Sequence, residues 1–126
     1  MAEAMITAKG REKLCKAHAG EAPLPKLKFI AYGDGGVDEE DVPIPVTGEE
    51  VALRNELLRM EIDEHNYPVA TTCEYKSGLS KEQLADVYIS ELGIFDEEED
   101  LVVYKTFLKK GKDGDMLFDF SLREIF

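Results

Sequence analysis

The residues of this sequence that could do chemistry are its histidines, its cysteines and its many carboxylates. His18, His65, Cys15 and Cys73 are the candidates for soft metal ligands or for nucleophile–base pairs. The cysteines are far apart and neither belongs to a Cys-x-x-Cys pair, so a zinc site would need ligands from four separate segments. A nucleophile also needs a positioned base, and neither histidine has a local signature around it. We therefore expect reduced, buried thiols and no metal centre.

The carboxylates outnumber the cations, with 27 acidic and 15 basic residues and a net charge of −12. In so acidic a chain, pairs of carboxylates say little about acid–base catalysis. The run Asp96–Asp100 holds adjacent acids that repel one another, which predicts an exposed hairpin tip. It lacks the alternating ligand spacing and central glycine of a calcium loop. We expect no catalytic residue, no metal ligand and no cofactor, so the chain is not expected to be an enzyme.

The charge balance also bears on macromolecular partners. A surface of this sign repels nucleic-acid phosphates and anionic lipids, so we expect neither nucleic acid nor membrane as a partner. The glycines at 33–36 lead into acids and prolines rather than into a helix, which favours a tight turn over a phosphate cradle. An alternative function remains, in which Asp38–Asp41 and Asp96–Asp100 imitate DNA phosphates and block a nucleic-acid-binding protein. That alternative requires the two runs to form one continuous stripe.

The elements that must position these residues begin with a helix at about Ala8–Ala19. Thr7 is suited to cap its N-terminus and Gly20 to end it. Gly10 inside the helix costs on the order of 1 kcal/mol relative to alanine, which indicates either that something packs closely against the first turn or that the start of the helix is frayed. A capping-box pattern from Thr47 to Glu50 predicts a short helix through about Asn55.

Most of the remaining chain has the composition or the alternation of strands. The predicted strands are Lys26–Tyr32, Leu58–Ile62, Val69–Tyr75, Val87–Phe95, Leu101–Leu108 and Met116–Ile125. Ser80–Ala85 is predicted to form a short helix or turn. In the strand that starts at Leu101, alternation places Leu101, Val103 and Phe107 on one face and Val102, Tyr104 and Leu108 on the other. Such a strand lies between two layers or presents one face to a partner.

The sequence therefore predicts one α+β domain over residues 1–126. Its N-terminal helix packs on a mostly antiparallel sheet of about five or six strands, with one or two short extra helices. No apolar run approaches the roughly 20 residues of a membrane span, and no secretory signal is visible. We expect the chain to fold in a reducing cytoplasm.

Four segments resemble, in order and approximate spacing, the phage tail-collar fibre domain. They are the helix start Ile6–Gly10, the strand and Gly-Asp-Gly turn Leu27–Gly35, the segment Leu53–Arg59 with its Asn-Glu pair, and Ile89–Asp96 with Glu-Leu-Gly-Ile-Phe-Asp. The strand after them, Leu101–Tyr104, is also similar.

The resemblance implies a structural role in a phage tail, folded in the bacterial host and assembled with other tail or baseplate proteins. It also implies a homo-oligomer, with a trimer favoured, and no catalytic residues. Members of the family usually continue into a shaft and a receptor-binding tip, whereas this chain stops at Phe126. We therefore expect a connector or a baseplate accessory, from a phage or a prophage.

Within the resembling segments, a small set of residues is the candidate structural or interface site. These are Asn55, Glu56, Arg59, Glu91, Gly93, Val102 and Tyr104. For Arg59 and Glu91, one hypothesis is a buried or interfacial ion pair that fixes strand register, and the alternative is that both are solvated. Gly93 between apolar neighbours indicates the close approach of a backbone or an aromatic ring.

Overall fold

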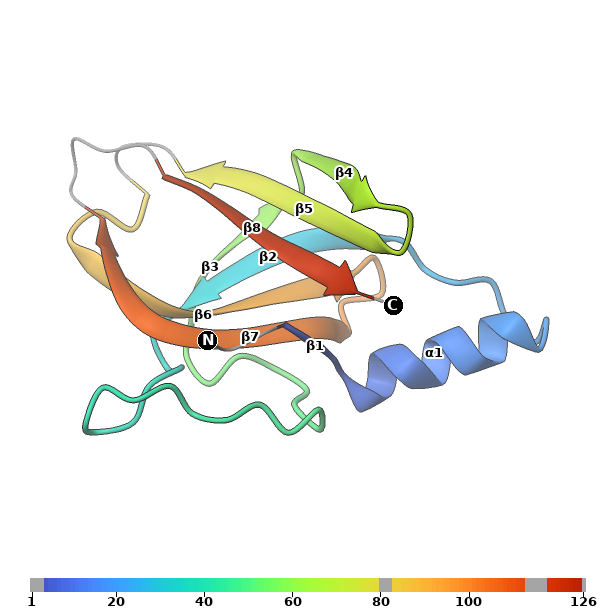
Figure 1. The fold of residues 1–126 in the computed structure, drawn as a ribbon, viewed down its shortest axis with the longest axis horizontal. Coiled ribbons are helices and arrows are strands. Elements are labelled where there is room, and N and C mark those ends of the chain that lie inside the picture. The colour runs from blue at the N-terminus through green and yellow to red at the C-terminus, as the bar shows by residue number, and fades with distance from the viewer. Residues whose placement is uncertain (1–3, 80–82, 113–117, 126) are drawn as a thin grey trace.

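The structure is a computed structural model that describes residues 4–79, 83–112 and 118–125. This part of the chain forms two antiparallel sheets and one α-helix (Figure 1). The five-stranded sheet has the order β1-β7-β6-β2-β3, and the three-stranded sheet has the order β4-β5-β8. The elements are β1 (Met5–Ile6), α1 (Ala8–His18), β2 (Leu27–Gly33), β3 (Glu56–Glu61), β4 (Glu64–Val69), β5 (Thr72–Leu79), β6 (Val87–Asp96), β7 (Leu101–Lys112) and β8 (Phe118–Ile125).

The helix α1 forms where it was predicted, and its cap is the predicted one. The backbone amide of Gly10 donates to the Thr7 hydroxyl oxygen at 3.1 Å, and Gly20 follows the helix with φ of +75°. The close packing inferred from Gly10 is confirmed, because a Cβ at this position would lie 2.9 Å from Cγ1 of Val102. In the described part of the chain, no helix is long and apolar enough to cross a bilayer.

The helix does not cover a sheet face, and this differs from the prediction. Gly10 is the one buried residue in α1, and the helix extends beyond the end of the five-stranded sheet (Figure 1). The three-stranded sheet covers one face instead, and the Tyr32 hydroxyl donates across to the carbonyl of Ser77 in β5 at 3.0 Å. The long loop 34–55 covers the other face, where Leu53 and Val46 pack. Both faces are therefore covered by the chain itself.

The helix predicted after Thr47 is absent, and residues 47–55 are irregular. The capping contacts do form, since the amides of Thr47 and Gly48 donate to the Glu50 carboxylate at 2.9 and 2.8 Å. The chain cannot continue as a helix because the amides of Arg54 and Asn55 donate instead to a distant acceptor, Glu91. The mostly antiparallel α+β architecture is confirmed. In the described residues α1 is the only helix, so the one or two short extra helices that were predicted do not occur there.

The strand β4 was not predicted. All of its residues are exposed, so the sequence lacks the inside–outside alternation that marks a half-buried strand. The partner strand β5 begins at Thr72 rather than at Val69 and runs on to Leu79. Residues 80–82, within the predicted helix or turn at Ser80–Ala85, lie outside the described residues, as does Met116 of the last predicted strand.

The predicted faces of β7 are wrong at its start. Ile94 of β6 pairs with Val103, but the next residue, Phe95, pairs with Leu101, so β7 carries a bulge there. An extra residue in one strand reverses the alternation of side chains across it. Leu101 consequently packs in the same cluster as Tyr104, and Val103 packs on the opposite face.

Candidate functional site

A fully buried carboxylate, that of Glu91, lies in the middle of β6 and is 0% exposed. Its Oε2 atom accepts hydrogen bonds from the backbone amides of Gly35 and Asn55, both at 2.9 Å. Its Oε1 atom accepts from the amide of Arg54 at 2.8 Å and from the hydroxyl of Tyr104 at 2.6 Å. Backbone donors and one phenol therefore satisfy this carboxylate.

A buried carboxylate is tolerated only when hydrogen bonds replace its hydration. Here each oxygen of Glu91 has two donors. Burial raises the pKa of Tyr104, and the hydrogen bond to Glu91 and the negative charge of Glu91 raise it further, so the phenol stays a neutral donor. With both oxygens occupied and no solvent access, Glu91 is placed to hold structure together rather than to exchange protons with a substrate.

The turn at Gly33–Gly35 lies so close to Glu91 and to the Arg54–Asn55 segment that it requires glycines. A Cβ at Gly35 would lie 2.6 Å from Cβ of Arg54 and 2.9 Å from Oε2 of Glu91. A Cβ at Gly33 would lie 2.5 Å from both the carbonyl oxygen of Asn55 and Oε2 of Glu91. No real side chain reaches such distances without moving backbone, so the turn must be glycine-rich for the loop to approach β6.

Side-chain contacts complete this junction, which we define as the Gly33–Gly35 turn, Arg54, Asn55, Glu91 and Tyr104. Nδ2 of Asn55 donates to Oδ1 of Asp34 at 2.5 Å, and the Asp34 amide donates to the carbonyl of Asn55 at 3.2 Å. Three segments far apart in sequence thus meet at one group. The remaining resembling segment, Ile6–Gly10, contacts the neighbouring strand β7. The Thr7 hydroxyl donates to the Leu101 carbonyl at 2.6 Å.

The structure brings three of the predicted site residues, Asn55, Glu91 and Tyr104, into direct contact at the junction. Gly93 lies beside it, and two leucines rather than a backbone or an aromatic ring approach it. A Cβ there would lie 2.6 Å from Cδ1 of Leu53 and 2.7 Å from Cδ1 of Leu101.

Val102 lies away from the junction, 6% exposed, under Gly10 of α1. Tyr104, at 1% exposure, is also covered by the chain's own elements. Neither residue offers a free surface to a partner.

Arg59 and Glu56 form a separate, partly exposed pair on β3. Nε of Arg59 donates to Oε2 of Glu56 at 3.0 Å and Nη2 donates to Oε1 at 2.9 Å. The guanidinium also stands 3.8 Å from the ring centroid of Phe95. Arg59 therefore pairs with Glu56 and not with Glu91, whose charge is balanced by amide dipoles instead of a cation.

Sequence reasoning missed the donors from Gly35 and Arg54 in the junction. Every residue except proline carries a backbone amide, so no residue type identifies these donors in advance. The Gly-Asp-Gly pattern was the available signal, since it indicates a backbone that something approaches closely.

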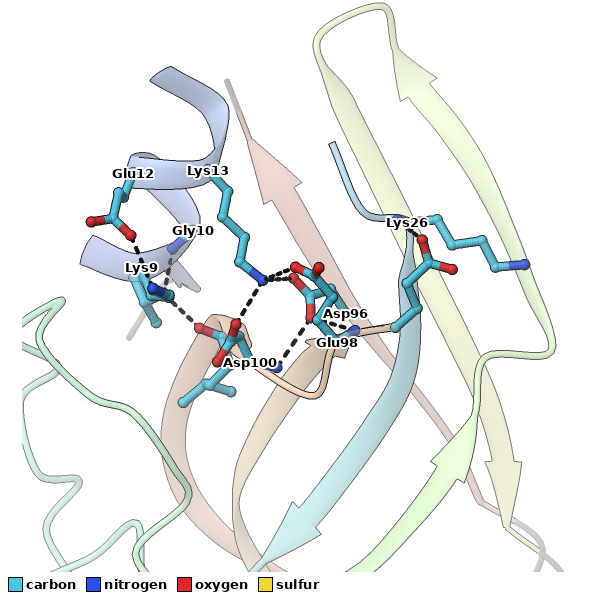
Figure 2. Close-up of polar contacts among 11 residues, drawn as sticks. Lys9, Gly10, Glu12, Lys13, Lys26, Asp96, Glu98 and Asp100 are labelled. Carbon is cyan, nitrogen blue, oxygen red and sulfur yellow. Dashed lines mark hydrogen bonds and ion pairs between the residues drawn. The ribbon is translucent and has the colours of Figure 1, made fainter. Parts of the chain in front are cut away.

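A second group of carboxylates lies at the turn between β6 and β7 (Figure 2). Nζ of Lys13, on α1, stands 2.5 Å from Asp96, 2.9 Å from Glu98 and 2.7 Å from Asp100. Burial alone would lower the pKa of Lys13, but hydrogen bonds to Asp100, Asp96 and Glu98 outweigh it and raise that pKa. These four residues form what we call the lysine latch, which ties α1 to the turn.

The geometry of the latch explains why so many acids tolerate one another. One carboxylate oxygen from each of Asp96, Glu98 and Asp100 lies within 4.8 Å of the others, close enough to hold a cation, and the ammonium of Lys13 takes that place. Oδ1 of Asp96 also accepts from the amides of Glu98 and Asp100 at 3.0 and 3.1 Å. The prediction of an exposed tip is wrong for Asp96, which is buried, and right for Glu97–Glu99.

The two acidic runs do not form one stripe. Asp41 of the first run pairs with Lys109 near the end of β7 at 3.3 Å, whereas the second run precedes the start of β7. At roughly 3.3 Å per residue, Leu101 and Lys109 are more than about 25 Å apart along the strand. The runs therefore lie at opposite ends of β7 (Figure 1), which argues against the DNA-mimic alternative.

Comparison with other proteins adds nothing to this geometry. No protein-family model matches the chain, and no curated protein matches it.

Proposed function

We propose that this chain is a structural protein of a phage or prophage tail, which connects tail-fibre or baseplate components through protein–protein contacts and catalyses no reaction. The observation that carries the proposal is the junction at Glu91. Three of the four segments that resemble the tail-collar fibre domain close on it, through the Gly-Asp-Gly turn, Asn55 and Glu91.

A chance likeness in separate short segments gives no reason for them to meet in space. Here each segment supplies a matched part: a turn that only glycines allow, amide donors from the Arg54–Asn55 segment, and the acceptor on β6. The distinctive residues of the resemblance thus have architectural roles. This supports a relationship in fold, and with it the structural role that the resemblance implies.

The surface available to partners lies at edges and loops, since both faces of the five-stranded sheet are covered. Large apolar side chains are nevertheless exposed around the molecule, among them Leu24, Tyr67, Val69 and Leu108. Exposed apolar groups of this kind are suited to contacts with other proteins. The proposed partners are other tail or baseplate proteins and further copies of the chain, with a trimer favoured, in the virion tail.

The proposal is tested by locating the chain in phage particles. Particles are induced from the bacterium that carries the gene, purified, and labelled with gold-conjugated antibodies against the folded protein. We expect gold at the distal end of the tail by electron microscopy, and none on particles from a strain in which the gene is deleted. If purified particles contain none of the chain by mass spectrometry, the proposed role is wrong.

A further inference from the structure

A hollow of about 460 Å³ lies between α1, the start of β2, the end of β3 and the β4–β5 hairpin. This volume lies within the range of roughly 300–1,000 Å³ that is usual for ligand pockets. Leu14, Leu27, Ile62 and Val102 give it apolar walls. Tyr67, 66% exposed, stands at the rim. The hollow therefore offers both apolar depth and an aromatic side chain at its mouth.

The aromatic rim is ordered by contacts between rings. The ring of His65 lies edge-on to that of Tyr67, with centroids 5.8 Å apart, and is tilted against that of Tyr75 at 6.2 Å. These three side chains come from the β4–β5 hairpin and all line the hollow. An exposed tyrosine held in this way is a common anchor in protein interfaces, because it supplies contact area at small entropic cost.

One wall of the hollow carries acidic side chains that have no ion-pair partner among the described residues. Glu61, Asp63 and Glu64 line it, and in the described ranges no lysine or arginine nitrogen lies within 4.0 Å of their carboxylates. Asp63 accepts from the amide of Gly78, at 2.9 Å. The acids of the lysine latch differ from these, because the three latch carboxylates share the ammonium of Lys13.

Lys26 and Lys28 also line the hollow, at the start of β2 directly beside β3, and in the described ranges neither forms an ion pair with these acids. The ammonium of Lys28 stands 5.3 Å from the ring centroid of Phe29, and the side chain of Lys26 points away from α1 (Figure 2). Since no ion pair to a described lysine or arginine occupies them, Glu61 and Glu64 can accept a cation from outside the chain.

We propose that this hollow is a docking groove for a segment of a different protein that inserts apolar side chains and places a lysine or arginine beside Glu61 and Glu64. The apolar walls and Tyr67 would bury the inserted side chains, and the unpaired carboxylates would complement the cation. A second copy of this chain is a poorer occupant, because each copy has a net charge of −12 and like charges repel. The inference rests on the proposed role in protein–protein contact but not on a location in a tail.

The test uses two short synthetic peptides with the same leucines and phenylalanines, one with lysine and the other with glutamate at the positions between them. Each is titrated into the isotope-labelled full chain while backbone amide shifts are recorded by NMR. We expect the lysine peptide to shift amides of β4, the end of β3 and α1, and the glutamate peptide to cause no saturable shift. Shifts scattered over the whole surface, or no binding by either peptide, overturn the proposal.

Matched variants separate docking from general attraction to an acidic protein. The double substitution Glu61→Gln and Glu64→Gln is compared with Glu39→Gln and Glu40→Gln, which removes the same charge from the acidic loop outside the hollow. We expect the first pair to weaken the lysine peptide by about fivefold and the second by less than about twofold. Equal weakening by both pairs overturns the proposal.

Tyr67→Ser tests the apolar part of the groove at a side chain that is 66% exposed. We expect it to weaken the lysine peptide by about tenfold. An unchanged affinity overturns the anchor role of Tyr67 and with it the groove. Gold labelling of tails is independent of this result, so the groove can fail while the proposed function stands, and the reverse is also true.

Discussion

Two sites in this molecule stabilise carboxylates in different ways. In the junction, Glu91 is fully buried and is satisfied by three backbone amides and a phenol. In the lysine latch, a single ammonium is shared by three carboxylates at the molecular edge. Fixed dipoles need no counter-ion and are little affected by salt, whereas the pairs of Lys13 with the more exposed Glu98 and Asp100 are screened. The junction should therefore determine whether the chain folds, and the latch should determine only how firmly α1 is held.

The strongest test of this comparison is removal of the buried acceptor. Glu91→Ala leaves the amides of Gly35, Arg54 and Asn55 without an acceptor, and we expect a loss of about 3–5 kcal/mol in the free energy of unfolding. Urea denaturation followed by circular dichroism measures it. Glu91→Gln keeps one acceptor oxygen and should lose less than Glu91→Ala. A loss below about 1 kcal/mol for the alanine variant would contradict the structural role of the carboxylate.

A smaller loss is expected from adding one methyl group to the turn. Gly35→Ala forces a Cβ to within 2.6 Å of Arg54 and 2.9 Å of Glu91, and we expect about 2–3 kcal/mol of destabilisation. Gly20→Ala is the matched control, since no atom lies within 4 Å of its added Cβ and only its φ of +75° opposes the substitution. The control should lose about 1 kcal/mol by the same thermal or urea measurement. Equal losses at the two glycines would show that crowding at the junction is unimportant.

Removing the phenol of the junction should cost about 1–2 kcal/mol at neutral pH, because Tyr104→Phe deletes one hydrogen bond to a charged acceptor. The folded-state pKa of Tyr104 is raised above the ordinary tyrosine value of 10.0, so its contribution is fully present below about pH 10 and is lost as pH rises further. The variant should therefore show a weaker alkaline decline in stability than the parent chain. An identical alkaline decline in the two proteins would show that a group other than the Tyr104 phenol causes it.

The smallest effect is expected at the latch. Lys13→Met should lower stability by about 1 kcal/mol in dilute buffer, because Glu98 and Asp100 lose a cation at the surface while the buried Asp96 keeps the amides of Glu98 and Asp100 as donors. In molar salt the difference from the parent should shrink, whereas the loss from Glu91→Ala should persist. Lys16→Met, on an exposed part of α1, is the control and should change little. A salt-independent loss at Lys13 would show that packing, not charge, is what the latch supplies.

How far the sequence predicted this structure depends on how local the causes are. Short-range patterns predicted three features correctly: the cap at Thr7, the close packing at Gly10 and the hairpin of β6 and β7. The missing helix after Thr47 has a distant cause, because the amides that a helix would use are taken by Glu91, 37 and 36 positions away. A pattern window around Glu50 contains no sign of that acceptor.

The candidate site shows the same division. Glu91 was identified as a charge of interest, but a cation was expected as its partner and the actual partners are mostly backbone amides. The bulge in β7, which moves Leu101 to the other face, likewise arises from pairing with β6 and leaves no mark in the alternation of β7. Interactions between segments, rather than the properties of any one segment, determined these outcomes.

The central claim is that loop amides distant in sequence are held by one buried carboxylate, and hydrogen exchange tests it most directly. Gly35, Arg54 and Asn55 lie outside the strands, yet their amides donate to Glu91. Measured by NMR in the native protein, these amides should exchange as slowly as those in the middle of β6, with opening free energies near that of global unfolding. If they exchange as fast as the amide of the exposed loop residue Val51, the junction does not hold the fold in the way described.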